Sequence, residues 1–397
     1  MKLTEYEEFF TPSAPVETRR LLFGREQEIV DLGSALRRKG YHPVVTGSRG
    51  VGKTSLVHIG VEQRPHIFVA CTRDMAFSDL CQSILEQLGA ASRLSSPYSD
   101  SGTSSGSFGA PRFTAGKMFD LLREIRRDVA VVIDEYDLIP SGNTAFHASV
   151  ADLLKLLSDH SKICPTRIIV VGVGRSAQDL LAEHDSIARC AIEIYLRPLK
   201  RQHVRDFLRK AEGSLHFRFD PAVAEKIVIE SGGFPYYVHV IGLHCIDQMI
   251  ARKARQHTVT QEDYLRAQQK AADQAFRSVL GRWRNSLRQF DQKEVLLLKE
   301  VISFDSPYPA RREVVERLQK GGLAPNETDL ALTRLERDRR IVWVDHKHKE
   351  QPIRFHDPLL RLFLRARIFP RLSTPTPQAA QMALFEESGE DEEAQGS

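Results

Sequence analysis

The segment Gly47-Ser48-Arg49-Gly50-Val51-Gly52-Lys53-Thr54 combines the residue types that bind the phosphates of a nucleotide. Its glycines allow backbone N–H groups to turn toward an anion, and the helix expected from Ser55 onward adds the positive end of its dipole. The Lys53 ammonium would reach the β- and γ-phosphate oxygens, and the Thr54 hydroxyl would ligate Mg²⁺. An apolar run, 43–46, precedes the loop. The context favours an ATP and Mg²⁺ site over a glycine-rich turn that only joins a strand to a helix.

A second chemical group follows another apolar run, 129–133, which ends in Asp134-Glu135. An acid at the carboxyl end of a buried strand beside a phosphate loop can hold the water shell of Mg²⁺, which predicts a metal role for Asp134. Glu135 is then placed to orient and deprotonate an attacking water. The alternative for Glu135 is a solvated carboxylate at a strand end. The upstream loop favours the hydrolytic role.

The elements that must position these groups alternate along the first part of the chain. Helix-like segments separate β-type apolar runs, which predicts an α/β fold with a parallel sheet covered by helices on both faces. The expected strands are 43–46, 67–71, 129–133, 168–173 and 191–196.

Polar residues follow the fourth strand and precede the fifth. Arg175 or Ser176 would sense the γ-phosphate, although Ser176 could instead simply cap the next helix, and both readings can hold at once. Arg189 stands where a residue of a ring-forming or dimerising ATPase reaches the γ-phosphate of a neighbouring subunit, so a homo-oligomer is one prediction. A surface arginine is the alternative for Arg189.

The motif Phe23-Gly24-Arg25-Glu26-Gln27-Glu28, upstream of the phosphate loop, resembles a box found in AAA+ and STAND-type ATPases. The order of this box, the phosphate loop, the Asp-Glu strand and the Gly-Val-Gly strand looks like that of the origin-recognition/initiator clade and its prokaryotic STAND relatives. The resemblance implies that Gly24 and Arg25 help to seat the adenine. Arg175 stands where initiator-type members usually carry Asn, Ser or Thr, and is closer to the STAND pattern.

A helical lid is expected after the P-loop ATPase core, which spans 1–197 and includes a flexible Ser/Gly loop at 91–116. The lid, 198–284, carries helical spacing throughout, and Thr258-Val259-Thr260-Gln261-Glu262-Asp263 is a helix N-terminal signal. Pro235, after Gly232-Gly233, resembles the proline of a STAND motif that packs near the base. An ordinary stop-and-start between two helices is the alternative.

A winged-helix domain, 285–371, is predicted from three helix-like segments followed by a hairpin pattern at 341–344 and 352–355. Its third helix, 327–339, and the hairpin tip would offer cations to double-stranded DNA: Arg334, Arg337, Arg340, Lys347 and Lys349. Acidic residues share that helix, and in STAND proteins such domains often hold the ATPase closed without touching DNA, so both outcomes stay open.

The tail, 372–397, is expected to be disordered because it is proline-broken and acidic. Within it, Gln381-Met382-Ala383-Leu384-Phe385 resembles the peptide by which bacterial proteins dock on the DNA polymerase sliding clamp. A glutamine amide and apolar plugs on a tether suit such a pocket, with Gln381, Met382, Leu384 and Phe385 as contacts. A hydrophobic turn that folds back on its own domain is the alternative.

Composition limits the class of protein. The 397 residues carry a formal net charge of +4, with six acidic residues gathered in the tail. The five scattered cysteines predict neither a disulfide framework nor a zinc site, and no signal peptide or membrane span is indicated, which suits the cytoplasm. The sequence thus predicts a slow ATPase switch that couples nucleotide state to oligomerisation and to DNA or a partner in replication, transposition or defence. The alternative is a signalling or scaffold ATPase that recruits an effector protein in trans without binding DNA.

Overall fold

The structure, a computed structural model, describes most of the chain. The described residues are 3–89, 113–125, 127–174, 176–181, 189–253, 257–278, 289–304, 306, 308–339, 341–346, 349–355 and 358–365. Most of the loop predicted at 91–116 and the whole tail, 372–397, lie outside this set. The chain divides into two compact units, Ser13–Leu199 and Met1–Pro12 with Lys200–Ser397. The finer division into four domains stays a prediction.

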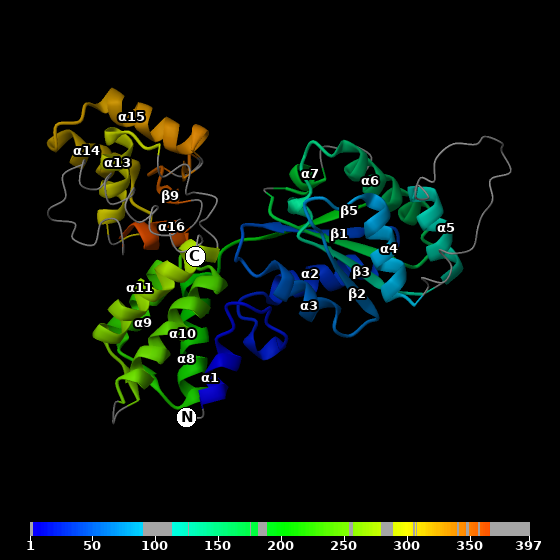
Figure 1. Ribbon diagram of the computed structural model, residues 1–397, viewed down its shortest axis with the longest axis horizontal. Helices are drawn as coiled ribbons and strands as arrows, with labels where there is room; N and C mark the ends of the chain where they lie inside the picture. Colours follow the sequence, from blue (N-terminus) through cyan, green and yellow to red (C-terminus); the bar gives the residue numbers. More distant parts are fainter. Residues whose placement is uncertain are drawn as a thin grey trace, which may run out of the picture. The chain divides into compact units, whose positions relative to one another are not determined.

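The unit Ser13–Leu199 is built on a parallel sheet with the strand order β2-β3-β4-β1-β5 (Figure 1). Its strands are β1 (His42–Gly47), β2 (His66–Ala70), β3 (Ala130–Asp134), β4 (Arg167–Val171) and β5 (Ala191–Leu196). Every residue of β1 and of β4 is buried, as expected for central strands covered on both faces. Strands β1, β4 and β3 are parallel, so the phosphate loop after β1 and Asp134 at the end of β3 lie at the same carboxyl end of the sheet. Strand β4 separates the two strands.

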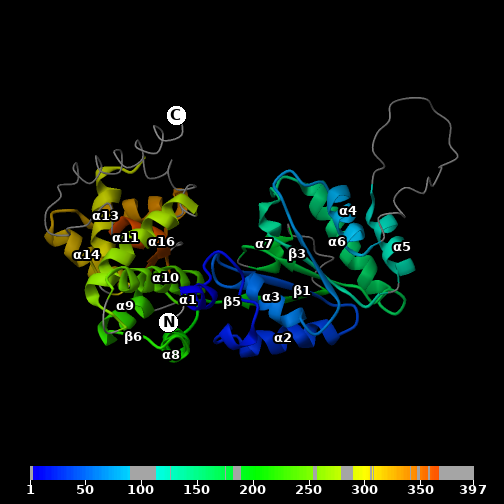
Figure 2. The ribbon, with the colours of Figure 1, turned by 60° about the horizontal axis from the view of Figure 1, so that its bottom comes forward.

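Helices cover both faces of this sheet (Figures 1 and 2). One face carries α2 (Glu26–Arg37) and α3 (Lys53–Val61), and the other carries α4 (Phe77–Gln87), α5 (Ala115–Ile125), α6 (Thr144–Asp159) and α7 (Ala177–Leu180). Apolar side chains at helical spacing, such as Leu80, Ile84 and Leu154, pack with Val131 in one buried cluster. The predicted fold class is confirmed.

The second unit begins with a helical bundle and a short strand pair that the sequence pattern did not reveal. The helices are α1 (Leu3–Phe9), α8 (Arg201–Leu215), α9 (Pro221–Glu230), α10 (Pro235–Ala251) and α11 (Gln261–Ser278), and the parallel pair is β6 (Arg218–Phe219) with β7 (Thr258–Val259). Helix α1 packs on α8 and α10. A side chain at Gly242 would overlap the Phe10 ring, so this close approach requires glycine.

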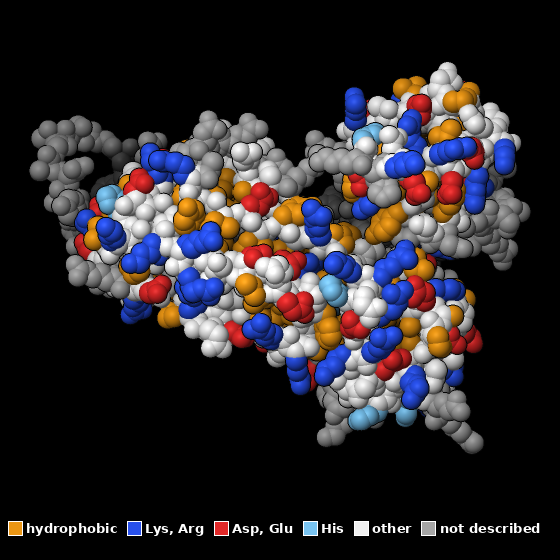
Figure 3. Space-filling view, turned by 180° about the vertical axis from the view of Figure 1, so that it is seen from behind, with side chains coloured by type: hydrophobic (Ala, Val, Ile, Leu, Met, Phe, Trp, Pro, Cys, Tyr) orange, Lys and Arg blue, Asp and Glu red, His pale blue; other side chains and the backbone are white. Residues whose placement is uncertain are grey.

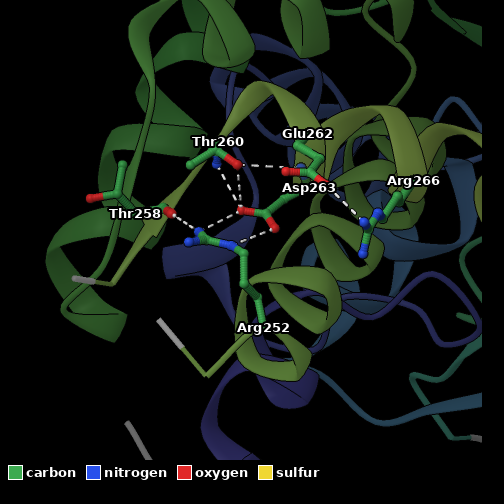
Figure 4. Close-up of polar contacts among 6 residues, drawn as sticks. All are labelled: Arg252, Thr258, Thr260, Glu262, Asp263 and Arg266. Carbon is green, nitrogen blue, oxygen red and sulfur yellow. Dashed lines mark hydrogen bonds and ion pairs between the residues drawn. The ribbon is translucent and has the colours of Figure 1, made fainter. Parts of the chain in front are cut away.

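The start of α11 is capped by a buried carboxylate (Figure 4). Asp263 accepts hydrogen bonds from the Thr260 backbone N–H and hydroxyl, each at 2.9 Å, and binds the Arg252 guanidinium through both oxygens. Arg252 also donates to the Thr258 carbonyl at 3.1 Å. Burial alone would raise the pKa of Asp263, but these hydrogen bonds lower it. The network joins the end of α10 to the start of α11, where the sequence predicted a helix N-terminus.

Three helices and a hairpin follow in the same unit, which is the element order of a winged helix. They are α13 (Gln292–Ser303), α14 (Arg311–Lys320), α15 (Pro325–Thr333), β8 (Val342–Val344) and β9 (Ile353–Phe355), with α16 (Pro358–Phe363) packed on α11. The predicted third helix differs in detail, because α15 starts two residues earlier and ends at Thr333 in a π-helical turn, η6 (Arg334–Asp338). Within the described residues, no helix is long and apolar enough to cross a membrane.

Candidate nucleotide-binding site

The loop between β1 and α3 takes its shape from three glycines. Gly47, Gly50 and Gly52 have φ values of 145°, 74° and 95°, in the region that side chains disfavour. A Cβ on Gly47 would lie 2.6 Å from the Leu196 carbonyl oxygen of β5, so the strand pair also excludes a larger residue. Such a run of left-handed and right-handed backbone is how loops form a concave nest of N–H groups for an anion.

Lys53, the first residue of α3, lies inside this loop and is 9% exposed. Its amine donates hydrogen bonds to the carbonyl oxygens of Gly47 at 3.1 Å and Ser48 at 3.0 Å. Burial lowers the pKa of Lys53 to about 8, and the carboxylates of Asp137 and Asp134 oppose that shift. A buried ammonium held only by neutral carbonyls is suited to exchange them for phosphate oxygens.

The two predicted metal ligands meet directly. The Thr54 hydroxyl, in the first turn of α3, donates to Oδ2 of Asp134, at the end of β3, at 2.9 Å. Asp134 Oδ1 accepts from the Glu135 backbone N–H at 2.8 Å, which fixes the carboxylate. A hydroxyl and a carboxylate are hard oxygen donors of the kind that Mg²⁺ prefers when phosphates supply the remaining ligands. The donor set therefore fits magnesium together with a nucleotide.

Glu135 has a strained backbone. Its φ of 52° and ψ of 32° are left-handed, which is uncommon for a residue with a side chain. The turn reverses the chain after β3 and starts the 3-10 helix η3 (Tyr136–Leu138), while the Glu135 side chain stays exposed. Strain of this kind concentrates at sites whose geometry matters for function.

The Arg25 side chain contacts the backbone of the phosphate loop, and Arg25 is 4% exposed. Its guanidinium donates to the carbonyl oxygens of Val51 at 3.0 Å and Arg197 at 2.7 Å, and pairs with Glu28 at 3.0 Å. The structure thus places Arg25 on the loop backbone, where it ties the upstream box to the end of β5. Gly24, with a φ of 62°, makes the preceding turn.

The structure also places Ser55, Arg49 and Ser176, three further residues that the sequence singled out. The Ser55 hydroxyl accepts a hydrogen bond from the Val16 backbone N–H at 3.0 Å, and Arg49 is exposed. Ser176 precedes α7 and its carbonyl accepts from Leu180 N–H. Arg175 is not among the described residues.

Arg189 and Pro235, two further predicted site residues, belong to elements other than the phosphate loop. Arg189 is exposed just before β5, at the sheet edge opposite the loop, because β5 runs parallel to β1 and pairs Gly47 with its last residue, Leu196. Five residues of strand separate the two edges by roughly 17 Å, so Arg189 cannot complete the site of its own chain. Pro235 is the first residue of α10 in the other unit.

Asp137 is a site residue that the sequence did not single out. Its Oδ1 accepts a hydrogen bond from the Val173 backbone N–H, at the end of β4, with a length of 2.8 Å. The available signal was a third acid in Asp134-Glu135-Tyr136-Asp137, but only the fold shows that it faces the fourth strand.

The cations predicted to face DNA are partly engaged within the protein. Arg334 pairs with Asp291 at 2.7 Å, whereas Arg337 and Lys349 are exposed. Arg340 and Lys347 fall outside the residues that the structure describes.

Comparisons with known proteins agree with this geometry. Residues 37–181 match the family model described as "AAA domain". The matched range contains the phosphate loop, Asp134 and the fourth strand, while the upstream box and β5 lie outside it. A search of curated proteins found no match for the sequence.

Solved structures were also compared with the chain. The Walker-type ATPase PABY2304 of Pyrococcus abyssi is 18% identical, with a TM-score of 0.57 over 90% of this chain and 99% of its own. Cdc6p from Pyrobaculum aerophilum is 16% identical, with a TM-score of 0.46 over 96% and 98% of the two chains. The Orc1 protein of Aeropyrum pernix, solved in complex with DNA, is 16% identical, with a TM-score of 0.46 over 92% and 96%. At such identities the likeness to PABY2304 shows the fold alone.

Proposed function

We propose that this protein is an ATPase switch that binds Mg·ATP at the AAA domain and hydrolyses it slowly. The observation that carries the proposal is the 2.9 Å hydrogen bond between Thr54 and Asp134, with the buried Lys53 amine in the adjacent loop. Lys53 and Thr54 at the start of α3 thus lie with Asp134 at the end of β3, and each has the chemistry of one part of a magnesium–triphosphate site.

The residues divide the work. The backbone of 47–54 cradles the phosphates, and Lys53 exchanges its two carbonyl partners for phosphate oxygens. Magnesium, when bound, would neutralise phosphate charge. Asp134 and Thr54 would hold it, and Glu135, which has a left-handed backbone, would accept the proton of the attacking water.

Oligomerisation is the second part of the proposal. Arg189 is exposed at the sheet edge away from its own phosphate loop, so its guanidinium can serve only a neighbouring subunit. An arginine supplied in trans would stabilise the charge that develops on the transferred phosphoryl group. ATP would then act as a bridge between subunits.

The lid turn before Pro235 would couple nucleotide state to the C-terminal elements. The Tyr308 hydroxyl donates to the Gly232 carbonyl at 3.1 Å, and Arg365 pairs with Glu230 at 3.4 Å. These two contacts join the turn before Pro235 to the three-helix and hairpin region of the same unit. A change at the turn would shift that region.

Partner binding without DNA is the second candidate for the output, and the ion pairs of the C-terminal region favour it. Arg311 pairs with Asp329 and Lys293 with Glu327, so acids of α15 already neutralise nearby cations. Figure 3 shows acidic side chains interspersed among the basic ones on the visible face. Among the predicted DNA contacts that the structure describes, the exposed Arg337 and Lys349 favour duplex DNA. An effector in trans, or the sliding clamp through the 381–385 peptide, would be the protein partner.

The experiment that tests the proposal measures binding and assembly together. A nonhydrolysable ATP analogue with Mg²⁺ is titrated into the full chain by calorimetry, and the mass of the protein is measured with and without it. We expect micromolar binding and a larger assembly for the wild type, no binding for Lys53→Ala, and binding without assembly for Arg189→Ala. Arg37→Ala, which removes one positive charge from an exposed position at the end of α2, serves as the control. Equal heats for wild type and Lys53→Ala would remove the proposed site.

A further inference from the structure

The Asp137 side chain links the turn after β3 to the segment that follows β4, two parts of the candidate site that are far apart in sequence. It lies in η3, three residues after Asp134, and its Oδ1 accepts from Val173 N–H at 2.8 Å. Val173 follows Gly172, whose N–H donates to the Val45 carbonyl of β1 at 3.1 Å. The next residue, Gly174, forms an antiparallel bridge with Gly47 at the start of the phosphate loop.

The residues around Asp137 are closely packed. A Cβ on Gly172 would lie 3.2 Å from the Asp137 backbone nitrogen and 2.6 Å from the tip of Leu180. The left-handed backbone of Glu135 directs the chain back over the end of β4, and the Leu138 N–H closes that turn on the Glu135 carbonyl at 2.9 Å. The Asp137 hydrogen bond therefore fixes the distance between the Glu135 turn and the segment that follows β4.

We propose that Asp137 is a positioning residue of the ATPase reaction. Its side chain holds the segment after β4 at a fixed position relative to the Glu135 turn. This inference rests on the proposed function. Asp137 acts through the Val173 amide and through the turn that carries Glu135, and it binds neither nucleotide nor magnesium. The segment after β4 then approaches the γ-phosphate only while this hydrogen bond is made. Its loss slows turnover and leaves the phosphate cradle of 47–54 intact.

Two substitutions separate the hydrogen bond from the charge. Asp137→Asn keeps an oxygen that accepts from Val173 N–H, whereas Asp137→Ala removes it. Steady-state hydrolysis of Mg·ATP by the full chain should show kcat lowered about tenfold or more in Asp137→Ala, with the affinity for the nonhydrolysable analogue within about twofold of wild type. Asp137→Asn should restore kcat to within about threefold. Asp152→Ala, an exposed carboxylate on α6, is the control.

Amide hydrogen exchange gives a readout that does not need turnover. Peptides that contain Val173 should exchange faster in Asp137→Ala than in wild type, and at the wild-type rate in Asp137→Asn. The inference is overturned if Asp137→Asn is as slow in turnover as Asp137→Ala, if Asp137→Ala hydrolyses ATP at the wild-type rate, or if it loses nucleotide affinity in proportion to kcat. Exchange that is faster in Asp137→Ala while the wild type neither binds nor hydrolyses ATP would remove the proposed function and its positioning role, and leave only a structural hydrogen bond.

Discussion

The candidate nucleotide site and the C-terminal three-helix region use charged residues in opposite ways. Lys53 and Asp134 carry opposite charges, yet the structure bonds Lys53 to carbonyls and Asp134 to a hydroxyl and an N–H. In the C-terminal region, Arg334 binds Asp291 at 2.7 Å and Arg311 binds Asp329 at 2.7 Å. Neutral partners leave charges available for a ligand, whereas carboxylate–guanidinium pairs neutralise each other. The comparison supports the proposal that the first region binds a ligand and that the ion pairs of the second serve mainly packing.

The largest effect is expected at Glu135. Glu135→Gln keeps the side-chain shape but removes the base, so hydrolysis should fall by about 100-fold or more while nucleotide affinity is retained. Single-turnover hydrolysis by wild type and variant measures this directly. Equal rates would show that Glu135 is a solvated carboxylate and would weaken the contrast between the two regions.

Arg25 tests whether the site depends on a buried scaffold. Arg25→Ala leaves the carbonyls of Val51 and Arg197 without their donor, which should cost about 2–4 kcal/mol of unfolding free energy and weaken nucleotide binding. Chemical denaturation of the full chain measures the loss, with the exposed Arg20→Ala as control. A change below about 0.5 kcal/mol in Arg25→Ala would mean that its contacts are not needed for the loop.

Buried histidines predict acid sensitivity in both units. Burial lowers the pKa of His42 and of His239 to about 4, and His239 Nδ1 accepts from the Thr11 N–H at 3.0 Å. The unfolded chain binds these protons at an ordinary pKa of about 6.5, so stability falls as the pH drops from about 6.5 to about 4 and then levels off. Each histidine contributes about 3 kcal/mol to this loss.

Thermal unfolding across that pH range measures the effect. His239→Gln keeps an acceptor for Thr11 and should remove about half of the acid sensitivity, while the exposed His257→Gln should leave it unchanged. Identical pH profiles for wild type and His239→Gln would show that this histidine is not held neutral.

The smallest effect is expected in the C-terminal region. Asp291→Asn releases Arg334 from its ion pair, which should raise affinity for duplex DNA by a few-fold and steepen its salt dependence by about one unit. Binding measured over a salt series checks this, with Asp345→Asn, whose partner Arg354 stacks between Tyr308 and Trp343, as the matched control. Strong wild-type binding that Arg334→Ala abolishes would contradict the assignment of this region to packing.

The sequence predicted the sheet because its signals are local. Apolar runs flanked by glycine or acid gave the strands to within a few residues, as β1 and β3 show. The motifs singled out Thr54 and Asp134, and the structure shows that a hydrogen bond joins their side chains. Their role as metal ligands stays a prediction.

The rest depended on contacts between distant residues that carry no local pattern. Arg25 donates to the carbonyl of Arg197, a residue far from it in sequence. Strands β6 and β7 have two residues each, too few for an alternation of apolar and polar residues to be recognised. The position of Asp137 could not be predicted for the same reason, because its partner is the backbone N–H of Val173 in the segment that follows β4. Every residue except proline has a backbone N–H, so residue types do not reveal which N–H will donate to a side chain.

The magnesium dependence of ATP affinity tests most directly whether Lys53, Thr54 and Asp134 form one site. Calorimetry is run with ATP in the presence of Mg²⁺ and in the presence of a chelator, on wild type and on Asp134→Asn. We expect Mg²⁺ to tighten binding to the wild type by about tenfold or more and to have little effect on the variant. An equal gain from Mg²⁺ in both proteins, or no binding by the wild type, would contradict the assignment.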